Sequence, residues 1–193
     1  MATALLWTSA DLETLPDDDK RYEIIEGELC MSRQPHLYHQ ETCGEIQARL
    51  WMWNKETGAG KVFFAPGIIF DDDEDVVPDV VWISHARLAT SLYEDGKLHS
   101  APELVIEVLS PGSTNERRDR EAKLKLYSRR GVHEYWIADW RTRQIEVYRR
   151  TNGGLELPHL EHVATLFHND TLTSPLLPGF VCPLDTLFED IKI

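Results

Sequence analysis

The chain has 193 residues, and its 33 acidic side chains against 20 basic ones give a formal net charge of −13. Apolar residues make up 42% of the sequence, which excludes a disordered chain and indicates a globular protein with a substantial buried core. No apolar run reaches the ~18 residues that a membrane-spanning helix needs, so we expect no membrane partner. Residues 1–7 contain no basic residue and too short an apolar segment for a signal peptide.

The three cysteines, Cys30, Cys43 and Cys182, are odd in number and lie far apart in the sequence. This spacing argues against a disulfide framework and against a zinc cluster. It is typical of a protein in a reducing compartment, so we expect a cytoplasmic location.

The negative net charge disfavours long-range attraction of nucleic acid. Basic residues are nevertheless concentrated between residues 117 and 150, whereas many acids lie at 17–19 and 71–75. The basic segment is either a local nucleic-acid-binding face or an ordinary solvated helix surface, and the sequence leaves both interpretations open.

The first third of the chain begins with a short capped helix near residues 8–13. Residues 22–31, with Gly27 near their centre, predict a hairpin or a single strand with a bulge. The pattern then becomes helical from 36 to 57 and stops at two glycines. One face of this helix carries the residues expected to be buried, which are His39, Cys43, Ile46, Leu50 and Trp53.

The middle of the chain predicts strands at 61–64 and 68–70, followed by an exposed acidic turn at 71–75. A calcium loop is the alternative for that turn, but the regular ligand spacing with a central Gly and a terminal Glu is missing. The mixed polar segment at 85–100 indicates a loop with a helical turn.

Asn115 or Thr114 is predicted to cap a helix that runs to Arg130, with Gly131 just past its end. The other expected elements of this half are strands at 134–138, 144–148 and 163–167, a turn at 152–154 and a short helix at 184–189.

Two acids interrupt short runs rich in Val and Ile, Asp79 within residues 76–82 and Glu107 within residues 104–109. Such runs are typical of buried strands, and a carboxylate inside one needs a charged or hydrogen-bonding partner. Each acid alone is more often a satisfied acid at a strand end. Two of them on successive strands favour a shared divalent cation, and carboxylate oxygens suit Mg²⁺.

Helical spacing places Asp119, Lys123 and Tyr127 on one face, and Arg118 and Lys125 on the opposite, solvated face. Lys123 is therefore the lysine that can reach Glu107. The structural alternative is an ordinary Asp119–Lys123 pair at a helix edge, which would contribute only ~0.3–0.5 kcal/mol. A bound Mg²⁺ lowers the pKa of water and offsets charge on a phosphoryl oxygen, so two acids and an ammonium would suit phosphodiester hydrolysis.

The order of these motifs resembles the Uma-type restriction endonuclease family of the PD-(D/E)XK nuclease superfamily. The resemblance covers nearly the whole chain. It is carried by residues 21–28, His39-Gln40, Pro78-Asp79, residues 104–111, Asp119, Lys123, Tyr127 and residues 131–139.

This resemblance implies an α/β (α+β) fold with a restriction-endonuclease-like core, a mixed β-sheet flanked by helices. We expect one domain over residues 1–193. It would consist of an N-terminal helix and hairpin at about 8–34, the nuclease core at about 36–150, and C-terminal strands with a short helix at about 155–193.

The resemblance further implies a deoxyribonuclease that acts on DNA, pairs as a homodimer and uses Mg²⁺, with Mn²⁺ as a substitute. Asp79 and Glu107 would be metal ligands, and Lys123 would position the water or the phosphate. His39, Gln40 and Glu23 are auxiliary candidates, although His39 is equally well explained as a hydrogen-bonded core histidine.

One position departs from the superfamily pattern, because the lysine expected two residues after the strand Glu is Leu109 here. Lys123 would have to supply the ammonium from the helix instead. Leu109 and the acidic net charge leave two other hypotheses open: a catalytically silent dimeric DNA-binding or scaffold protein, and a metal-binding protein without a nucleic-acid partner.

Overall fold

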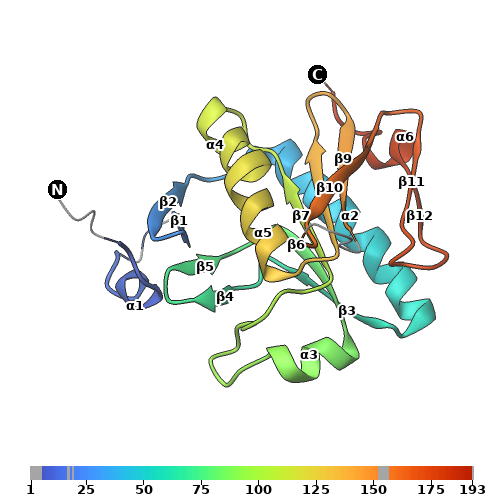
Figure 1. Cartoon of the computed structure of the whole chain (residues 1–193). Helices are drawn as coiled ribbons and strands as arrows, with labels where there is room; N and C mark the ends of the chain where they lie inside the picture. Colours follow the sequence, from blue (N-terminus) through green and yellow to red (C-terminus); the bar gives the residue numbers. More distant parts are fainter. Residues whose placement is uncertain (1–5, 17, 19, 152–156, 193) are drawn as a thin grey trace.

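The structure is a computed structural model that describes residues 6–16, 18, 20–151 and 157–192 (Figure 1). Its main sheet has six strands in the order β10-β9-β8-β7-β6-β3. Only β7 and β8 are parallel neighbours within it, so the sheet is mixed, as expected. The strands are β3 (Gly60–Phe64), β6 (Val80–Ser84), β7 (Leu104–Val108), β8 (Glu134–Asp139), β9 (Gln144–Arg150) and β10 (Leu160–Leu166).

Helices cover both faces of this sheet, so that β6, β7 and β8 are buried on both sides (Figure 1). On one face, α2 (Leu37–Thr57) packs its predicted stripe, including Leu50 and Trp53, against alternate strand residues such as Trp82. On the other face, Leu126 and Tyr127 pack against the intervening residues. The helical stripe predicted from the sequence is confirmed, since all five of its members are buried.

A second sheet of four strands packs against the same face as Tyr127, in the order β2-β1-β5-β4. Residues around Gly27 form a true hairpin, which rules out the single bulged strand. The short helix α1 (Ser9–Leu12) precedes it and is capped by Thr8, whose backbone N–H donates to Asp11 at 2.8 Å. The strands of this sheet are β1 (Arg21–Ile25), β2 (Glu28–Ser32), β4 (Ile68–Asp71) and β5 (Glu74–Val76).

The expectation of an exposed turn at 71–75 is wrong for its second half. Glu74 and Asp75 are buried in β5, and only the residues before them form a turn. Glu74 accepts hydrogen bonds from Arg129, at 2.5 Å, and from Arg130. The two arginines offset the cost of burying the carboxylate, which is why an acidic stretch can serve as a strand here.

Truncating this carboxylate tests the attachment of the small sheet to the helix. We expect Glu74→Ala to lower the free energy of unfolding by about 1–3 kcal/mol, because it removes charged hydrogen bonds to two partly exposed arginines. Urea unfolding followed by Trp fluorescence measures this loss. Asp72→Ala is the matched control, since that side chain is exposed, and an equal loss in both variants would contradict the assignment.

The helical stretch from 113 to 130 differs from a regular helix in two ways. It begins after Gly112, whose φ of +114° favours glycine, so the expected caps at Thr114 and Asn115 are wrong. Its middle is π-helical, and such segments are frequent at functional sites. The three pieces, ended by Gly131 as predicted, are α4 (Ser113–Arg117), the π-helical segment η1 (Arg118–Lys123) and α5 (Leu124–Arg130).

The other elements complete the fold and lie outside the central strands. They are α3 (His85–Ser91), β11 (Thr171–Thr173), β12 (Val181–Pro183) and α6 (Leu184–Leu187). The turn predicted at 152–154 lies outside the described residues. Among the helices in the described part of the chain, none combines the length and the apolar character needed to cross a bilayer.

Candidate active site

The two strand acids face each other across neighbouring strands. Val80 of β6 pairs with Ile106 of β7 in an antiparallel register, so the next position outward brings Asp79 opposite Glu107. Glu107 points to the α5 face of the sheet, where it meets Lys123 and Tyr127, whereas Asp79 immediately precedes β6 and also meets His39 of α2. The predicted convergence of these two carboxylates is therefore built into the strand pairing.

Asp79 is buried and is held by three donors. Its Oδ2 accepts the Val108 N–H at 2.9 Å and lies 3.3 Å from His39 Nε2, while its Oδ1 lies 3.3 Å from Arg21 Nη1. Burial alone would raise the pKa of Asp79, but the hydrogen bonds from His39 and from the Val108 N–H, with the nearby Lys123 charge, bring it down to about 2. Asp79 is thus a carboxylate at neutral pH.

Lys123 is fully buried among carboxylates. Its Nζ lies 2.9 Å from Glu107 Oε1, 2.9 Å from Glu23 Oε1 and 3.8 Å from Asp119 Oδ1. Burial opposes its charged form, but Glu107, Glu23 and Asp119 raise its pKa above the ordinary value, so the lysine is an ammonium. Lys125 is exposed, as the helical spacing predicted.

Glu107 accepts hydrogen bonds from Lys123 and from the Tyr127 hydroxyl, both on Oε1 and both at 2.9 Å. Burial raises its pKa to about 8, and the neighbouring Asp79 and Asp119 add to this rise against the lowering effect of Lys123. Leu109 is buried in the core beyond it, so the ammonium at Glu107 comes from the helix and not from the strand.

Asp119 lies at the same centre and was predicted only as a neighbour of Lys123 on the helix. Burial is the main cause of its raised pKa, which is about 6 despite the lowering effect of Lys123 and Arg118. Its Oδ1 is buried and has no hydrogen-bond partner among the described residues. Arg118, expected on the solvated face, instead lies 3.7 Å from this oxygen, so that expectation is wrong.

The three auxiliary candidates are placed differently. Glu23 is buried, and its Oε1 accepts the Val77 N–H at 2.9 Å as well as meeting Lys123. His39 is buried against Asp79. Gln40 is exposed and is absent from the residues that line the central cavity in the described structure.

A second donor set lies beside Asp79 and was not singled out from the sequence. The Cys43 sulfur is 3.6 Å from His39 Nδ1, and the candidate ligand atoms of His39, Cys43 and Asp79 lie within 4.8 Å of one another. Burial raises the pKa of the Cys43 thiol, with Asp79 and Glu107 adding to the rise. The thiol is therefore protonated, which favours carboxylate oxygens over sulfur as metal ligands here.

A cavity of about 270 Å³ opens onto these groups. Arg21, Arg33 and Arg118 contribute positive charge to its wall, and none of them was predicted to lie at the site. The full lining consists of Lys20, Arg21, Glu23, Ser32, Arg33, Gln34, Pro35, His39, Asp79, Glu107, Val108, Ser110, Arg118, Asp119 and Lys123.

The donor set around this cavity fits a divalent cation. Four buried carboxylates surround one buried ammonium, Asp119 Oδ1 has no hydrogen-bond partner among the described residues, and burial together with the neighbouring acids raises the pKa of Glu107. Oxygen ligands with room for water are what Mg²⁺ requires. The carboxylates that could hold the ion are Glu23, Asp79, Glu107 and Asp119.

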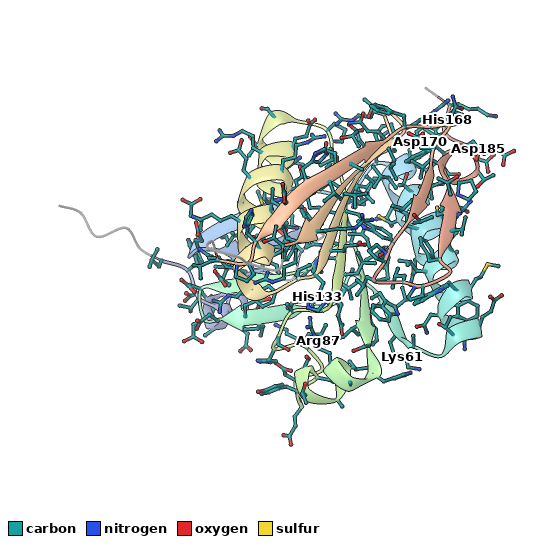
Figure 2. All side chains as sticks on the ribbon, turned by 45° about the vertical axis from the view of Figure 1, so that its right-hand side comes forward. Lys61, Arg87, His133, His168, Asp170 and Asp185 are labelled. Carbon is teal, nitrogen blue, oxygen red and sulfur yellow. The ribbon has the colours of Figure 1, made fainter. Side chains whose placement is uncertain are left out.

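The motif residue His133 does not belong to this centre. Its Nε2 lies 3.1 Å from Arg87 Nη2 of α3, and Figure 2 shows the two side chains near one another at the start of β8. Burial and the Arg87 charge lower the pKa of His133. The residue therefore connects α3 to the main sheet and contributes to the fold.

Comparison with known proteins supports both the fold and the family. The chain is similar to the crystal structure of a putative nuclease belonging to DUF820 from Anabaena variabilis, with a TM-score of 0.70 and 19% identity over 94% of this chain and 97% of that chain. This likeness confirms the restriction-endonuclease-like fold. No curated protein matches the chain. The family model of Uma2, described as "Putative restriction endonuclease", matches residues 9–185, and the chain therefore belongs to the Uma2 restriction endonuclease family.

Proposed function

We propose that the protein is a Mg²⁺-dependent deoxyribonuclease that hydrolyses phosphodiester bonds, with Mn²⁺ as a substitute ion. The observation that carries this proposal is the convergence of Asp79, Glu107 and Lys123 on one cavity. Asp79 and Glu107 would hold the ion. When bound, the ion would lower the pKa of a water molecule and offset the charge that develops on the phosphate.

Lys123 would act as a charged donor. An ammonium whose pKa is raised cannot accept a proton near neutral pH, so a role as general base is disfavoured. It would instead orient the water or stabilise the negative charge on the scissile phosphate. Glu23 would hold Lys123 in place through the 2.9 Å contact.

His39 would position Asp79. It donates from Nε2 to Asp79 only if Nε2 carries the proton, and the Cys43 thiol beside Nδ1 supports that form by acting as a donor. Gln40 retains no role in this proposal, because its side chain is exposed.

Cleavage of supercoiled plasmid tests the proposal. We expect Asp79→Ala, Glu107→Ala and Lys123→Ala each to lower the cleavage rate by about 10²–10³, the effect of removing one electrostatic contributor to a transition state. The wild type should cut with Mg²⁺ or Mn²⁺ and not with EDTA. Lys125→Ala is the control and should cut like the wild type. Unchanged rates in all three site variants would refute the assignment.

Plasmid cleavage combined with DNA binding, measured by fluorescence anisotropy, distinguishes the alternatives. Arg21 against Asp79 and Leu109 in place of a strand lysine favour a catalytically silent, dimeric DNA-binding or scaffold protein. DNA binding in EDTA, with no cleavage under any metal, would support that function. A protein that binds metal but shows no salt-dependent anisotropy change with labelled DNA would be a metal-binding protein without a nucleic-acid partner.

We propose that residues 1–193 form one domain that functions as a homodimer, as expected for an enzyme that cuts both strands. Light scattering coupled to gel filtration measures the dimer. The free cysteines Cys30, Cys43 and Cys182 support a cytoplasmic location, because a reducing compartment keeps thiols unpaired.

A further inference from the structure

Strand β1 sends two charged side chains toward the candidate site. Arg21 and Glu23 are alternate residues and so point to the same side of the hairpin. Glu23 contacts Lys123, whereas Arg21 contacts Asp79. The β1–β2 hairpin, which precedes the core in sequence, therefore contributes two charged residues to the candidate active site.

The two oxygens of Asp79 differ in how firmly they are held. Oδ2 accepts the Val108 N–H at 2.9 Å and meets His39 at 3.3 Å. Oδ1 meets only Arg21, at 3.3 Å, within the described part of the chain. Oδ1 is therefore the oxygen that a metal ion could take without breaking the connection between Asp79 and β7.

Arg21 is held loosely in this position. Its Nη1 is 3.3 Å from Asp79 Oδ1 and 3.4 Å from the Val77 carbonyl oxygen, both beyond the usual hydrogen-bond length. Its side chain is 35% exposed, against 6% for Asp79. A partly exposed pair with long contacts contributes little stability, so Arg21 can leave at small cost.

We propose that Arg21 is the counter-ion of Asp79 Oδ1 in the metal-free protein, and that it gives up this oxygen to a divalent ion and binds a phosphate of the nucleic acid. This inference rests on the proposed nuclease function and adds a residue that contacts both the metal ligand and the substrate. A guanidinium suits both partners, because its planar fork matches carboxylate and phosphate groups equally well.

The distribution of basic residues favours the segment from Arg21 to Arg33, at the cavity, as the part of the protein that contacts phosphate. Most basic residues of the long helix, together with Arg141 and Arg149, are paired with acids of the protein itself, which supports their interpretation as an ordinary surface, whereas Arg150 of β9 donates to the Ser128 carbonyl. Arg33, by contrast, is exposed at the cavity and has no ion-pair partner in the described chain. The paired residues are Arg117, Arg120, Lys125, Arg129, Arg130, Arg141 and Arg149.

Mn²⁺ binding, measured by the loss of the free-ion signal in electron paramagnetic resonance, tests the first half of the proposal. We expect Arg21→Ala to bind Mn²⁺ about three- to ten-fold more tightly than the wild type, because a competing positive charge is removed. Arg33→Ala is the matched control and should keep the wild-type Mn²⁺ affinity, since Arg33 contacts no carboxylate within the described chain. Unchanged or weaker Mn²⁺ binding in Arg21→Ala would overturn the proposal.

Binding of a fluorescein-labelled DNA duplex tests the second half, by anisotropy with Ca²⁺ and with EDTA, on duplex shown by gel to remain intact. Arg21→Ala should weaken binding about three- to ten-fold with Ca²⁺ and by less than two-fold with EDTA, the change expected from one phosphate contact. Arg33→Ala should weaken binding in both conditions, and Arg117→Ala in neither. An equal loss for Arg21→Ala with and without Ca²⁺ would overturn the exchange of partners.

The two measurements distinguish failure of this inference from failure of the nuclease function. Wild-type cleavage with no gain in Mn²⁺ affinity for Arg21→Ala refutes the inference and leaves the nuclease intact. A gain in Mn²⁺ affinity without any DNA binding supports the counter-ion role and refutes the nucleic-acid contact. Absence of Mn²⁺ binding in both proteins refutes the two proposals together.

Discussion

Replacing Lys123 with methionine should lower the free energy of unfolding by about 3–5 kcal/mol, the effect of removing one partner from a buried ionic group. Methionine is unbranched and of similar length, so the change removes the charge while largely keeping the packing. Glu107 and Glu23 would both lose an ammonium at 2.9 Å, and Glu23, whose pKa is lowered, would remain buried as an uncompensated carboxylate. Urea unfolding at pH 7.5, followed by Trp fluorescence, measures the loss.

Two further variants sharpen this prediction. Lys125→Met is the matched control, because Lys125 is exposed and pairs only with Glu26, and it should change stability by less than about 1 kcal/mol. In the Lys123→Met background, Glu23→Gln should recover part of the loss, since one unpaired acid becomes neutral. Additive losses from the two substitutions would show that Glu23 does not hold Lys123.

The central part of this site was predictable from the sequence because it depends on local rules. Asp79 and Glu107 each interrupt a short apolar run, and strand alternation places Glu107 of β7 on a defined face, while Asp79 immediately precedes β6. Lys123 follows from helical spacing, which separates it from Lys125. The set was inferred without knowing the strand order, because two buried strands that follow one another in the sequence and carry one acid each suggest a shared partner.

The rest of the site was not predictable, because it depends on contacts between segments far apart in the chain. Glu23 was predicted only as an auxiliary candidate, and nothing local to β1 indicates that it meets Lys123 one hundred residues later. Arg118 was expected to be solvated, since regular helical spacing was assumed and the π-helical segment alters that spacing. Helical and strand periodicities carry no information about such partners.

Amino-acid composition was misleading for Glu74 and Asp75, which were predicted to be exposed. Five consecutive acids are typical of an exposed turn, yet two of them are buried in β5. The signal that could have corrected this lies elsewhere in the sequence, in the paired Arg129 and Arg130 at the end of the long helix. A charged side chain is buried only where the tertiary structure places an oppositely charged partner beside it, and composition does not reveal that placement.

The metal-free protein should lose stability as the pH rises from about 5 to about 8, and a divalent ion should reverse this loss. The pKa of Glu107 is about 8 in the folded protein, against an ordinary value of 4.5. Between these values the folded state holds a proton that the unfolded state has released, so the free energy of unfolding falls as the pH rises. Asp119, with a pKa of about 6, adds to the fall in the lower part of this range.

Asp79 does not contribute to this slope. Its pKa is lowered to about 2 from an ordinary value of 3.8, so its stabilising contribution is complete at pH 5 and is lost only in strong acid. The fall toward pH 8 therefore reports mainly on Glu107, because Asp119 contributes only in the lower part of the range, where the lowered pKa of His133 acts in the opposite direction. Glu107→Gln, which carries no titrating proton, should flatten it, whereas Glu161→Gln on the exposed edge strand β10 should leave it unchanged.

Saturating Mg²⁺ completes the experiment, because protons and the ion would compete for the same carboxylate. Mg²⁺ at about one hundred times its Kd stabilises a folded protein by about 2.7 kcal/mol, and we expect the wild type to show this gain at pH 8 but a much smaller gain at pH 5. Glu107→Gln should lose most of the gain at pH 8. Thermal unfolding with Mg²⁺ and with EDTA measures all of these differences. Equal stabilisation of the wild type and Glu107→Gln by Mg²⁺ would mean that the ion binds elsewhere, and the proposed hydrolysis at Asp79 and Glu107 would then lose its basis.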